Sequence, residues 1–278
     1  MTSAPETRGT TTPSASVNAA SSGASPSPVL LSLRGVTKSF GPVQALQHVD
    51  MDIPAGQVTA LIGDNGAGKS TLIKTIAGIY APTSGDMLWK GEKVHVHTPR
   101  DAEALGIATV YQDLALCDNL DIVQNMFLGH ESTRRGLLDE ISMELTSKKV
   151  LSDLSVTTVK SARQLVGSLS GGQRQSIAVA RAVMRESQLV IMDEPTAALG
   201  VSQTAQVLDL ITRLATRGIA VLVISHNLND VLAVANRIAV MYLGTLVSEG
   251  PVSEYDTASA VELITTGVRA SDSLARPA

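Results

Sequence analysis

The sequence predicts an α/β fold built on a mainly parallel sheet with helices on both faces. Short apolar runs bounded by breaker residues recur along the chain, and helical patterns lie between several of them. Strands that alternate with helices are typical of parallel sheets, because a parallel connection needs a crossover that is usually a helix. The 278 residues, 44% of them hydrophobic, are enough for one large domain or two small ones.

The elements follow from the period of the hydrophobic pattern. Alternation of apolar and polar residues over Val29–Phe40 predicts the first strand, and residues 68–77 have the composition of a helix. Further helical patterns cover residues 202–216 and 228–235. Five more strands are predicted from short apolar runs at residues 58–62, 107–111, 189–192, 219–224 and 238–242.

Residues 113–167 differ from the rest of the chain. They carry more charge, show no clear strand, and contain helical patterns at 121–127 and 140–154. We expect them to form a helical subdomain inserted in the sheet domain. The first 28 residues have almost no large apolar side chain, which predicts a disordered tail, and residues 268–278 are expected to form a second loose end.

Composition excludes several classes of protein. A net charge of −4 and a pI near 5.7 give no general basic field for nucleic acid. The longest apolar stretches fall short of the roughly 20 residues that span a bilayer. The single cysteine, Cys117, cannot form an internal disulfide or a cysteine-based zinc site. These observations favour an α/β protein of a reducing compartment.

A glycine-rich segment directly after the strand at 58–62 carries the strongest chemical signal. It matches the phosphate-binding pattern G-x-x-x-x-G-K-[ST], in which glycines let backbone N–H groups converge on an anion and the following helix points its positive end at it. Lys69 is expected to bridge β- and γ-phosphates, and the Ser70 hydroxyl to ligate Mg²⁺. The predicted ATP-binding segment comprises Gly63, Asp64, Asn65, Gly66, Ala67, Gly68, Lys69 and Ser70, followed by Thr71.

Two adjacent carboxylates, Asp193 and Glu194, follow the apolar strand at 189–192. Side chains at this position emerge from the edge of a sheet. We expect Asp193 to lie near Mg²⁺, directly or through water, and Glu194 to polarise the attacking water as general base.

A third motif, Leu169–Ser170–Gly171–Gly172–Gln173, opens a helical run 23 residues before Asp193. It presents a second set of free N–H groups to an anion, and one nucleotide does not need two such loops from one chain. Here the sequence resembles the nucleotide-binding subunit of ABC transporters, over residues 29–267. The resemblance implies a P-loop NTPase core with N-terminal antiparallel β strands and an inserted helical subdomain. It also implies that residues 170–173 contact the γ-phosphate held by a partner subunit.

Other positions acquire roles from this resemblance. Gln112 matches the glutamine that reaches toward Mg²⁺ and links the core to the helical subdomain, and His226 matches the histidine that bonds the γ-phosphate. Phe40 lies where the family places an aromatic ring on adenine; a core phenylalanine that closes a strand is the alternative. The family usually has Ser-Ala-Leu-Asp where this chain has residues 197–200, Ala-Ala-Leu-Gly. The missing aspartate affects one expected contact between subunits.

Two functions are compatible with these motifs. The first is the ATPase of an importer, because no membrane segment is evident and a separate permease must be supplied. Residues 63–70, 111–114 and 224–227 resemble those of monosaccharide importers of the ribose, xylose or fructose type. That resemblance implies ATP and Mg²⁺ as cofactors and a homodimer. It also implies an integral-membrane sugar permease as partner and, indirectly, a periplasmic or lipid-anchored sugar-binding protein. The implied location is the cytoplasmic face of the bacterial inner membrane. Apolar residues of 114–120 are expected either to receive the permease or to pack within the subdomain.

The alternative function is a soluble ABC ATPase that acts on ribosomes or DNA. Such proteins usually have two cassettes or a long coiled-coil insertion and tend to carry basic arms. None of these features is evident in the sequence, so the importer is the preferred interpretation and no nucleic-acid partner is expected.

Overall fold

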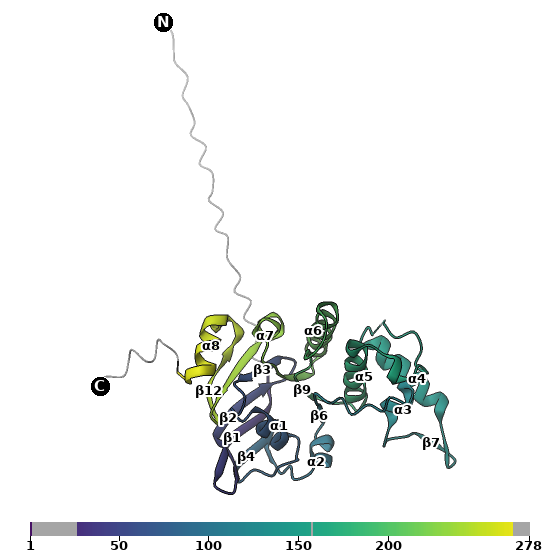
Figure 1. Cartoon of the computed structure of the whole chain (residues 1–278), viewed down its shortest axis with the longest axis horizontal. Helices are drawn as coiled ribbons and strands as arrows, with labels where there is room; N and C mark the ends of the chain where they lie inside the picture. Colours follow the sequence, from purple (N-terminus) through teal and green to yellow (C-terminus); the bar gives the residue numbers. More distant parts are fainter. Residues whose placement is uncertain (2–26, 157, 269–278) are drawn as a thin grey trace, which may run out of the picture.

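The computed structural model describes Met1 and residues 27–156 and 158–268. The predicted tails, 1–28 and 268–278, therefore lie almost entirely outside the described residues. The described chain forms a mixed α/β structure with two main sheets and a helical region to one side of them (Figure 1). The predicted α/β class is confirmed.

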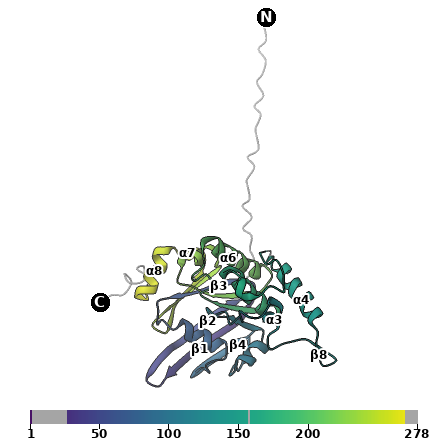
Figure 2. The same ribbon diagram turned by 45° about the vertical axis from the view of Figure 1, so that its right-hand side comes forward.

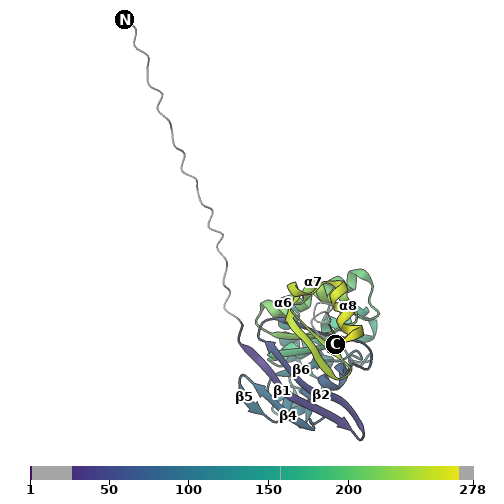
Figure 3. The same cartoon turned by 90° about the vertical axis from the view of Figure 1, so that its left-hand side faces the viewer.

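The first main sheet is antiparallel, with the strand order β2-β1-β4-β5. Figure 3 shows these strands together, away from helices α7 and α8. Only β1 is predicted individually from the sequence. The neighbouring β2 is interrupted by polar residues and by a positive φ of 48° at His48, so its apolar alternation is broken. The four strands are β1 (Val29–Phe40), β2 (Val43–Pro54), β4 (Ser84–Trp89) and β5 (Glu92–Val94).

The second main sheet has six strands in the order β12-β11-β3-β10-β9-β6. The five strands of this sheet that the sequence predicts run parallel, and β12 pairs antiparallel with β11. The central strands β3 and β10 are buried throughout, which explains why they are continuous apolar runs in the sequence. The strands are β3 (Val58–Gly63), β6 (Ile107–Val110), β9 (Leu189–Asp193), β10 (Ala220–Ile224), β11 (Arg237–Tyr242) and β12 (Thr245–Pro251).

Apolar side chains fill both faces of the six-stranded sheet. On one face Leu61 and Leu222 pack in the same cluster as Leu33 of the antiparallel sheet. On the other face Val190 packs in the same cluster as Val207 of α6. None of the helices in the described part of the chain has the length and apolar run needed to cross a bilayer. The helices beside the sheets are α1 (Lys69–Ile76), α2 (Pro99–Ala104), α6 (Val201–Thr216), α7 (Leu228–Val234) and α8 (Thr257–Thr266).

The helical region contains α3 (Ile122–Phe127), α4 (Glu140–Asp153) and α5 (Gly171–Met184), as the sequence predicts. The prediction that residues 113–167 hold no strand is wrong. Strands β7 (Thr133–Arg134) and β8 (Leu137–Leu138) form a small hairpin, visible beside α4 in Figure 2. Its two-residue turn has positive φ at both positions, as in a type I′ turn. Strands of two residues are too short to produce a periodic signal.

One buried side chain organises the segment that enters the helical region. Asn125 of α3 is fully buried; its amide oxygen accepts the Cys117 N–H at 2.7 Å. Its amide nitrogen donates to the carbonyls of Cys117, Leu120 and Asp121 at 3.0, 3.3 and 3.0 Å. These bonds satisfy the backbone polar groups of a turn that belongs to neither helix nor sheet.

Replacing Asn125 with alanine is therefore expected to reduce the free energy of unfolding by about 2–3 kcal/mol, because buried backbone groups lose their partners. Urea unfolding followed by circular dichroism measures the change. Asn119→Ala is the matched control, since Asn119 is exposed in the same segment. Equal stability of the two variants would contradict the role assigned to Asn125.

Candidate functional site

The carboxyl ends of four parallel strands meet at one edge of the six-stranded sheet. Strand β10 lies between β3 and β9, with Ile224 paired to both Leu61 and Asp193. Strand β6 lies beside β9, with Val110 paired to Met192. This register brings the predicted glycine-rich loop, the two carboxylates and the histidine to the same edge, although more than 160 residues separate the first from the last. The edge is the default position for a ligand in a sheet of this kind.

The loop after β3 follows a path that only glycine permits at its two ends. Gly63 has φ 155°, and a Cβ there would lie 2.4 Å from the carbonyl oxygen of Met241. Gly68 has φ 101°, and its Cβ would lie 2.8 Å from the carbonyl oxygen of Ala45. Both glycines allow the backbone to approach neighbouring strands closely. The loop is thereby held against the sheet with its N–H groups available to an anion.

Lys69 begins α1 and turns back over this loop. Its Nζ donates to the carbonyl oxygens of Gly63 and Asp64 at 2.7 and 2.9 Å. Burial lowers the pKa of Lys69, whereas the negative charges of Glu194, Asp64 and Asp193 oppose that shift. No side chain caps the N-terminus of α1, so its first N–H groups also face the loop. The cradle of N–H groups, the absence of Cβ atoms and the lysine cation suit a polyphosphate.

An open pocket of about 450 Å³ extends from the loop. Exposed Ser70 and half-buried Thr71 contribute to it. The walls that come from β2 and from the turn between β11 and β12 carry no motif, so the sequence does not predict them. The pocket is lined by Val43, Gln44, Ala45, Gln47, Asp64, Asn65, Gly66, Gly68, Lys69, Ser70, Thr71, Leu243 and Gly244.

The two carboxylates after β9 lie in different environments. Burial, reinforced by the charge of Glu194, raises the pKa of Asp193, and Lys69 and Lys74 oppose this shift. Glu194 is 18% exposed and has φ 51°, and its Oε2 lies 2.8 Å from Nδ1 of His226. His226 follows β10 and is 73% exposed. The Glu194–His226 pair can therefore orient a water molecule at the mouth of the loop.

A hydrogen bond also joins the segment after Glu194 to the helix after His226. The Thr196 hydroxyl donates to Oδ2 of Asp230 at 2.7 Å, which links the segment after Glu194 to helix α7 after His226. The Asn227 side chain caps α7 by accepting the N–H groups of Asn229 and Asp230. These contacts restrict how far Glu194 and His226 can move apart.

Residues 170–173 lie apart from the loop. Ser170 and Gln173 form a capping box at the N-terminus of α5, and the Gln173 side chain donates to the Thr158 carbonyl at 2.7 Å. Cβ atoms at Gly171 and Gly172 would meet the side chains of Leu199 and Gln203 at 2.9 and 3.0 Å. None of residues 170–173 lines the pocket of the described chain. Within one chain, the structure keeps apart the two segments that the sequence predicts to bind an anion.

The sequence pattern of the ABC transporter family matches residues 46–197, more than half of the chain. The chain belongs to the ABC transporter family. It is 45% identical over 237 residues to the xylose/arabinose import ATP-binding protein of Sulfolobus acidocaldarius, which covers 85% of this chain and 94% of that relative. It is 43% identical over 243 residues to the fructose import ATP-binding protein of Rhizobium meliloti, with the same two coverages.

A solved ATP-binding cassette of an ABC transporter, in its ADP conformation, has the same fold. It gives a TM-score of 0.73 at 25% identity, over 89% of this chain and 99% of that one. The predicted family and ABC ATPase fold are confirmed, and the chain is a nucleotide-binding ATPase of this family. The matched proteins favour the transporter interpretation over an ATPase of ribosomes or DNA.

Three other positions expected from the ABC resemblance, Phe40, Gln112 and Gly200, are not among the residues that line the pocket. Phe40 is 42% exposed at the end of β1, so the alternative of a core phenylalanine is wrong. Its ring meets Tyr80 edge-to-face at 5.1 Å, and Lys38 Nζ lies 5.1 Å from its centroid. Gly200 caps α6 with open space around its Cβ position, so an aspartate would fit there without a clash.

Gln112 is exposed just beyond β6. Of the two alternatives for the apolar residues that follow it, packing describes Leu114 and Leu116, which are half-buried against the main core. Arg181 of α5 donates to the carbonyl oxygens of Leu114 and Ala115 at 3.1 and 3.0 Å. The segment after Gln112 is therefore fastened to α5.

In the metal-free protein, Asp193→Asn is expected to raise the free energy of unfolding at pH 7, because it removes a partly buried carboxylate beside Glu194. The raised pKa means that ionised Asp193 destabilises the folded state above that pKa. The penalty disappears as the pH falls to the unfolded-state value of about 4. Urea unfolding in the presence of a chelator, at pH 7 and at acidic pH, measures this convergence.

Glu92→Gln is the control for that measurement, because it removes an exposed carboxylate from β5. A destabilised Asp193→Asn protein at pH 7 would contradict the assigned cause of the pKa shift.

Proposed function

We propose that the protein is the ATP-hydrolysing subunit that powers import of a sugar, specifically a monosaccharide, through a separate membrane permease. The observation that carries this proposal is the combination of the phosphate-binding loop, the Glu194–His226 pair and the likeness to two import ATP-binding proteins. Xylose, arabinose and fructose, named for those relatives, are all monosaccharides. The proposed nucleotide-binding domain spans residues 29–267, with a helical subdomain at 113–167 and the signature at 169–173.

ATP is proposed to lie between two copies of the chain arranged head to tail. Each nucleotide would contact the loop at 63–71 of one copy and residues 170–173 of the other. The separation of these two segments within one chain supports this arrangement, since each has N–H groups suited to an anion. The Phe40 ring is exposed, and Phe40 pairs with Val43 of the pocket wall, so the ring would contact adenine.

Hydrolysis would use groups that already lie at the strand ends. The water oxygen bonds to the γ-phosphorus, the bridging bond to the β-phosphate breaks, and Glu194 accepts the water proton. With a proton on each ring nitrogen, His226 would donate from Nδ1 to Glu194 and from Nε2 to a γ-phosphate oxygen. Lys69 neutralises β- and γ-phosphate oxygens. Mg²⁺, when bound, would shield the same oxygens, and Ser70, Asp193 and Gln112 are the residues proposed to hold it.

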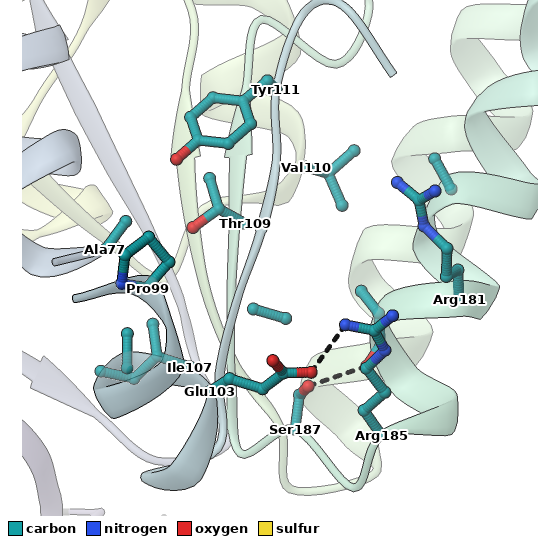
Figure 4. A pocket seen from close by; sticks show the side chains of 14 residues that line it. Ala77, Pro99, Glu103, Ile107, Thr109, Val110, Tyr111, Arg181, Arg185 and Ser187 are labelled. Carbon is teal, nitrogen blue, oxygen red and sulfur yellow. Dashed lines mark hydrogen bonds and ion pairs between the residues drawn. The ribbon is translucent and has the colours of Figure 1, made fainter. Parts of the chain in front are cut away.

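A groove of about 340 Å³ between α2, β6 and α5 is the proposed receiver of a cytoplasmic segment of the permease (Figure 4). Tyr111 lines it directly before Gln112, and Arg181, which fastens the following segment, forms its far wall. Glu103 and Arg185 pair across the groove at 2.6 Å. A permease segment bound in the groove would therefore contact residues next to Gln112. With a permease on this face, the subunit would lie at the cytoplasmic side of the plasma membrane, and a periplasmic or lipid-anchored sugar-binding protein would act on the other side.

Glu194→Gln is expected to retain ATP binding and to lower hydrolysis by about 10²–10⁴-fold, because the proton acceptor is lost. The ATP-bound dimer should then persist and elute as a dimer in size-exclusion chromatography. Glu92→Gln serves as the control variant and should hydrolyse ATP normally. Hydrolysis by Glu194→Gln at a near wild-type rate would contradict the assignment of the base.

Lys69→Ala is expected to abolish sugar uptake while the fold and membrane association are retained. Loss of this charge-assisted contact, about 1.5–3 kcal/mol, weakens ATP binding by roughly ten- to a hundredfold and affects the transition state more. Uptake of labelled pentoses and hexoses by cells that also express the permease is the measurement. Circular dichroism checks folding, and Lys160→Ala, at an exposed position, is the control. Normal uptake by folded Lys69→Ala protein would mean that this subunit does not power transport.

A further inference from the structure

Two aromatic rings and a lysine meet at the end of β1. The Phe40 ring contacts the Tyr80 ring edge-to-face, with 5.1 Å between the ring centroids and 77° between the ring planes. Lys38 Nζ lies 5.1 Å from the Phe40 centroid and 5.7 Å from the Tyr80 centroid, so one ammonium lies over both rings. Phe40 is exposed, whereas Lys38 and Tyr80 are half-buried. We call these three residues the ring cluster.

Hydrogen bonds fasten the segment after α1 to the end of β1. Lys38 Nζ donates to the carbonyl oxygen of Ala81 at 2.7 Å. The N–H of Thr83 donates to the carbonyl oxygen of Thr37 at 2.8 Å, and the Thr83 hydroxyl accepts the N–H of Ser39 at 3.0 Å. These three bonds fix the backbone on both sides of the ring cluster, so the two rings meet at a defined position.

The same segment is held at the C-terminus of α1. The N–H groups of Ile79 and Tyr80 both donate to the carbonyl oxygen of Lys74, at 2.8 and 3.1 Å. Lys74 Nζ also lies 5.8 Å from the Tyr80 ring centroid. Helix α1 begins at Lys69, beside the phosphate-binding loop, and Tyr80 follows its C-terminal end. One short helix therefore connects the lysine expected to bind phosphate with the ring that contacts Phe40.

Phe40 has the location of a nucleotide contact but needs other groups to fix its ring. It is the last residue of β1 and pairs with Val43, which lines the pocket of the phosphate-binding loop. An exposed side chain at a strand end keeps its rotamer freedom unless a neighbour restricts it, and ligand binding to a mobile ring loses that freedom. The contacts of the ring cluster restrict the Phe40 ring before any ligand arrives.

We propose that Tyr80 is a positioning residue for nucleotide binding, which together with Lys38 holds the Phe40 ring in the orientation that contacts adenine. The inference rests on the proposed contact between Phe40 and the base, and it deepens that contact by assigning the group that fixes the ring. Tyr80 acts through Phe40 and does not itself contact the nucleotide. A ring that is already oriented raises the affinity for ATP, because less side-chain freedom is lost on binding.

The test compares the binding of ATP with that of inorganic tripolyphosphate, which has no base. Both are titrated calorimetrically into the full chain in excess chelator, so that ATP is not hydrolysed. Tyr80→Ala is expected to weaken ATP binding about two- to tenfold, the range of an edge-to-face aromatic pair. Its affinity for tripolyphosphate should equal that of the wild type, which also shows that the variant is folded. Tyr80→Leu, which keeps apolar volume without a ring, should show the same selective loss, and Tyr80→Phe should restore ATP binding.

A double-mutant cycle tests whether Tyr80 acts through Phe40. Phe40→Ala is expected to lose at least about fivefold in ATP affinity, as when the aromatic partner of a stacked base is removed. In that background Tyr80→Ala should cause no further loss, because the ring that it positions is absent. Ile79→Ala is the matched control, since Ile79 is 44% exposed directly before Tyr80 and lies outside the ring cluster. The control should bind both ligands as the wild type does.

Equal losses of ATP and tripolyphosphate affinity in Tyr80→Ala would assign the residue to the integrity of α1 and would overturn the proposal. A further loss of ATP affinity in the Phe40→Ala background would also overturn it. Normal ATP binding by Tyr80→Ala, together with weak binding by Phe40→Ala, would overturn this inference alone. Normal ATP binding by Phe40→Ala would overturn the proposed adenine contact as well. Failure of the import function is distinguishable, since it would appear as normal sugar uptake with Lys69→Ala.

Discussion

The convergence of four parallel strand ends is the constraint on which the site depends. Because β10 lies between β3 and β9, the loop at Gly63, the carboxylate of Glu194 and the ring of His226 meet although they are distant in sequence. The central strands are buried on both faces, so their register is strongly fixed. The hydrogen bond between Thr196 and Asp230 continues this alignment beyond the sheet. Displacement of one strand would separate groups that are proposed to act on the same phosphate.

Several features at the same edge, namely shifted pKa values and unusual backbone angles, do not by themselves stabilise the folded state. Burial lowers the pKa of Lys69 and raises that of Asp193, and Glu194 has a left-handed backbone. Glycines at both ends of the loop let its backbone approach neighbouring carbonyl groups where a Cβ atom would clash. Perturbed groups and strain of this kind gather where ligands bind, because the ligand supplies the missing charge. The large apolar clusters on both sheet faces hold this edge in place.

The helical region joins the sheets partly through polar contacts. Arg181 donates to two carbonyl oxygens of the segment after Gln112, and Glu103 of α2 pairs with Arg185 and approaches His130. Polar contacts between parts of a chain permit relative motion more readily than an apolar interface does. The nucleotide edge lies on the sheet side of this junction, and the groove proposed for the permease lies at the junction itself. The same junction also holds an apolar cluster that includes Met126 of α3 and Val190 of β9, so the two parts share a core as well as polar contacts.

The sequence by itself determined the elements with strong local patterns. Buried parallel strands are continuous apolar runs, so all five parallel strands after β1 were predictable. The chemistry expected of the glycine-rich loop and of Asp193–Glu194 followed from their residue types and spacing. Strand β2, the short β5 and the β7–β8 hairpin escaped prediction because polar residues, a positive φ or small length erased their period. Only the tertiary structure decided the contact of His226 with Glu194, the pocket walls at Gln47 and Leu243, and the separation of Ser170 from the loop. Those contacts follow from strand order and helix packing, which bring distant residues together and leave no trace in the local pattern.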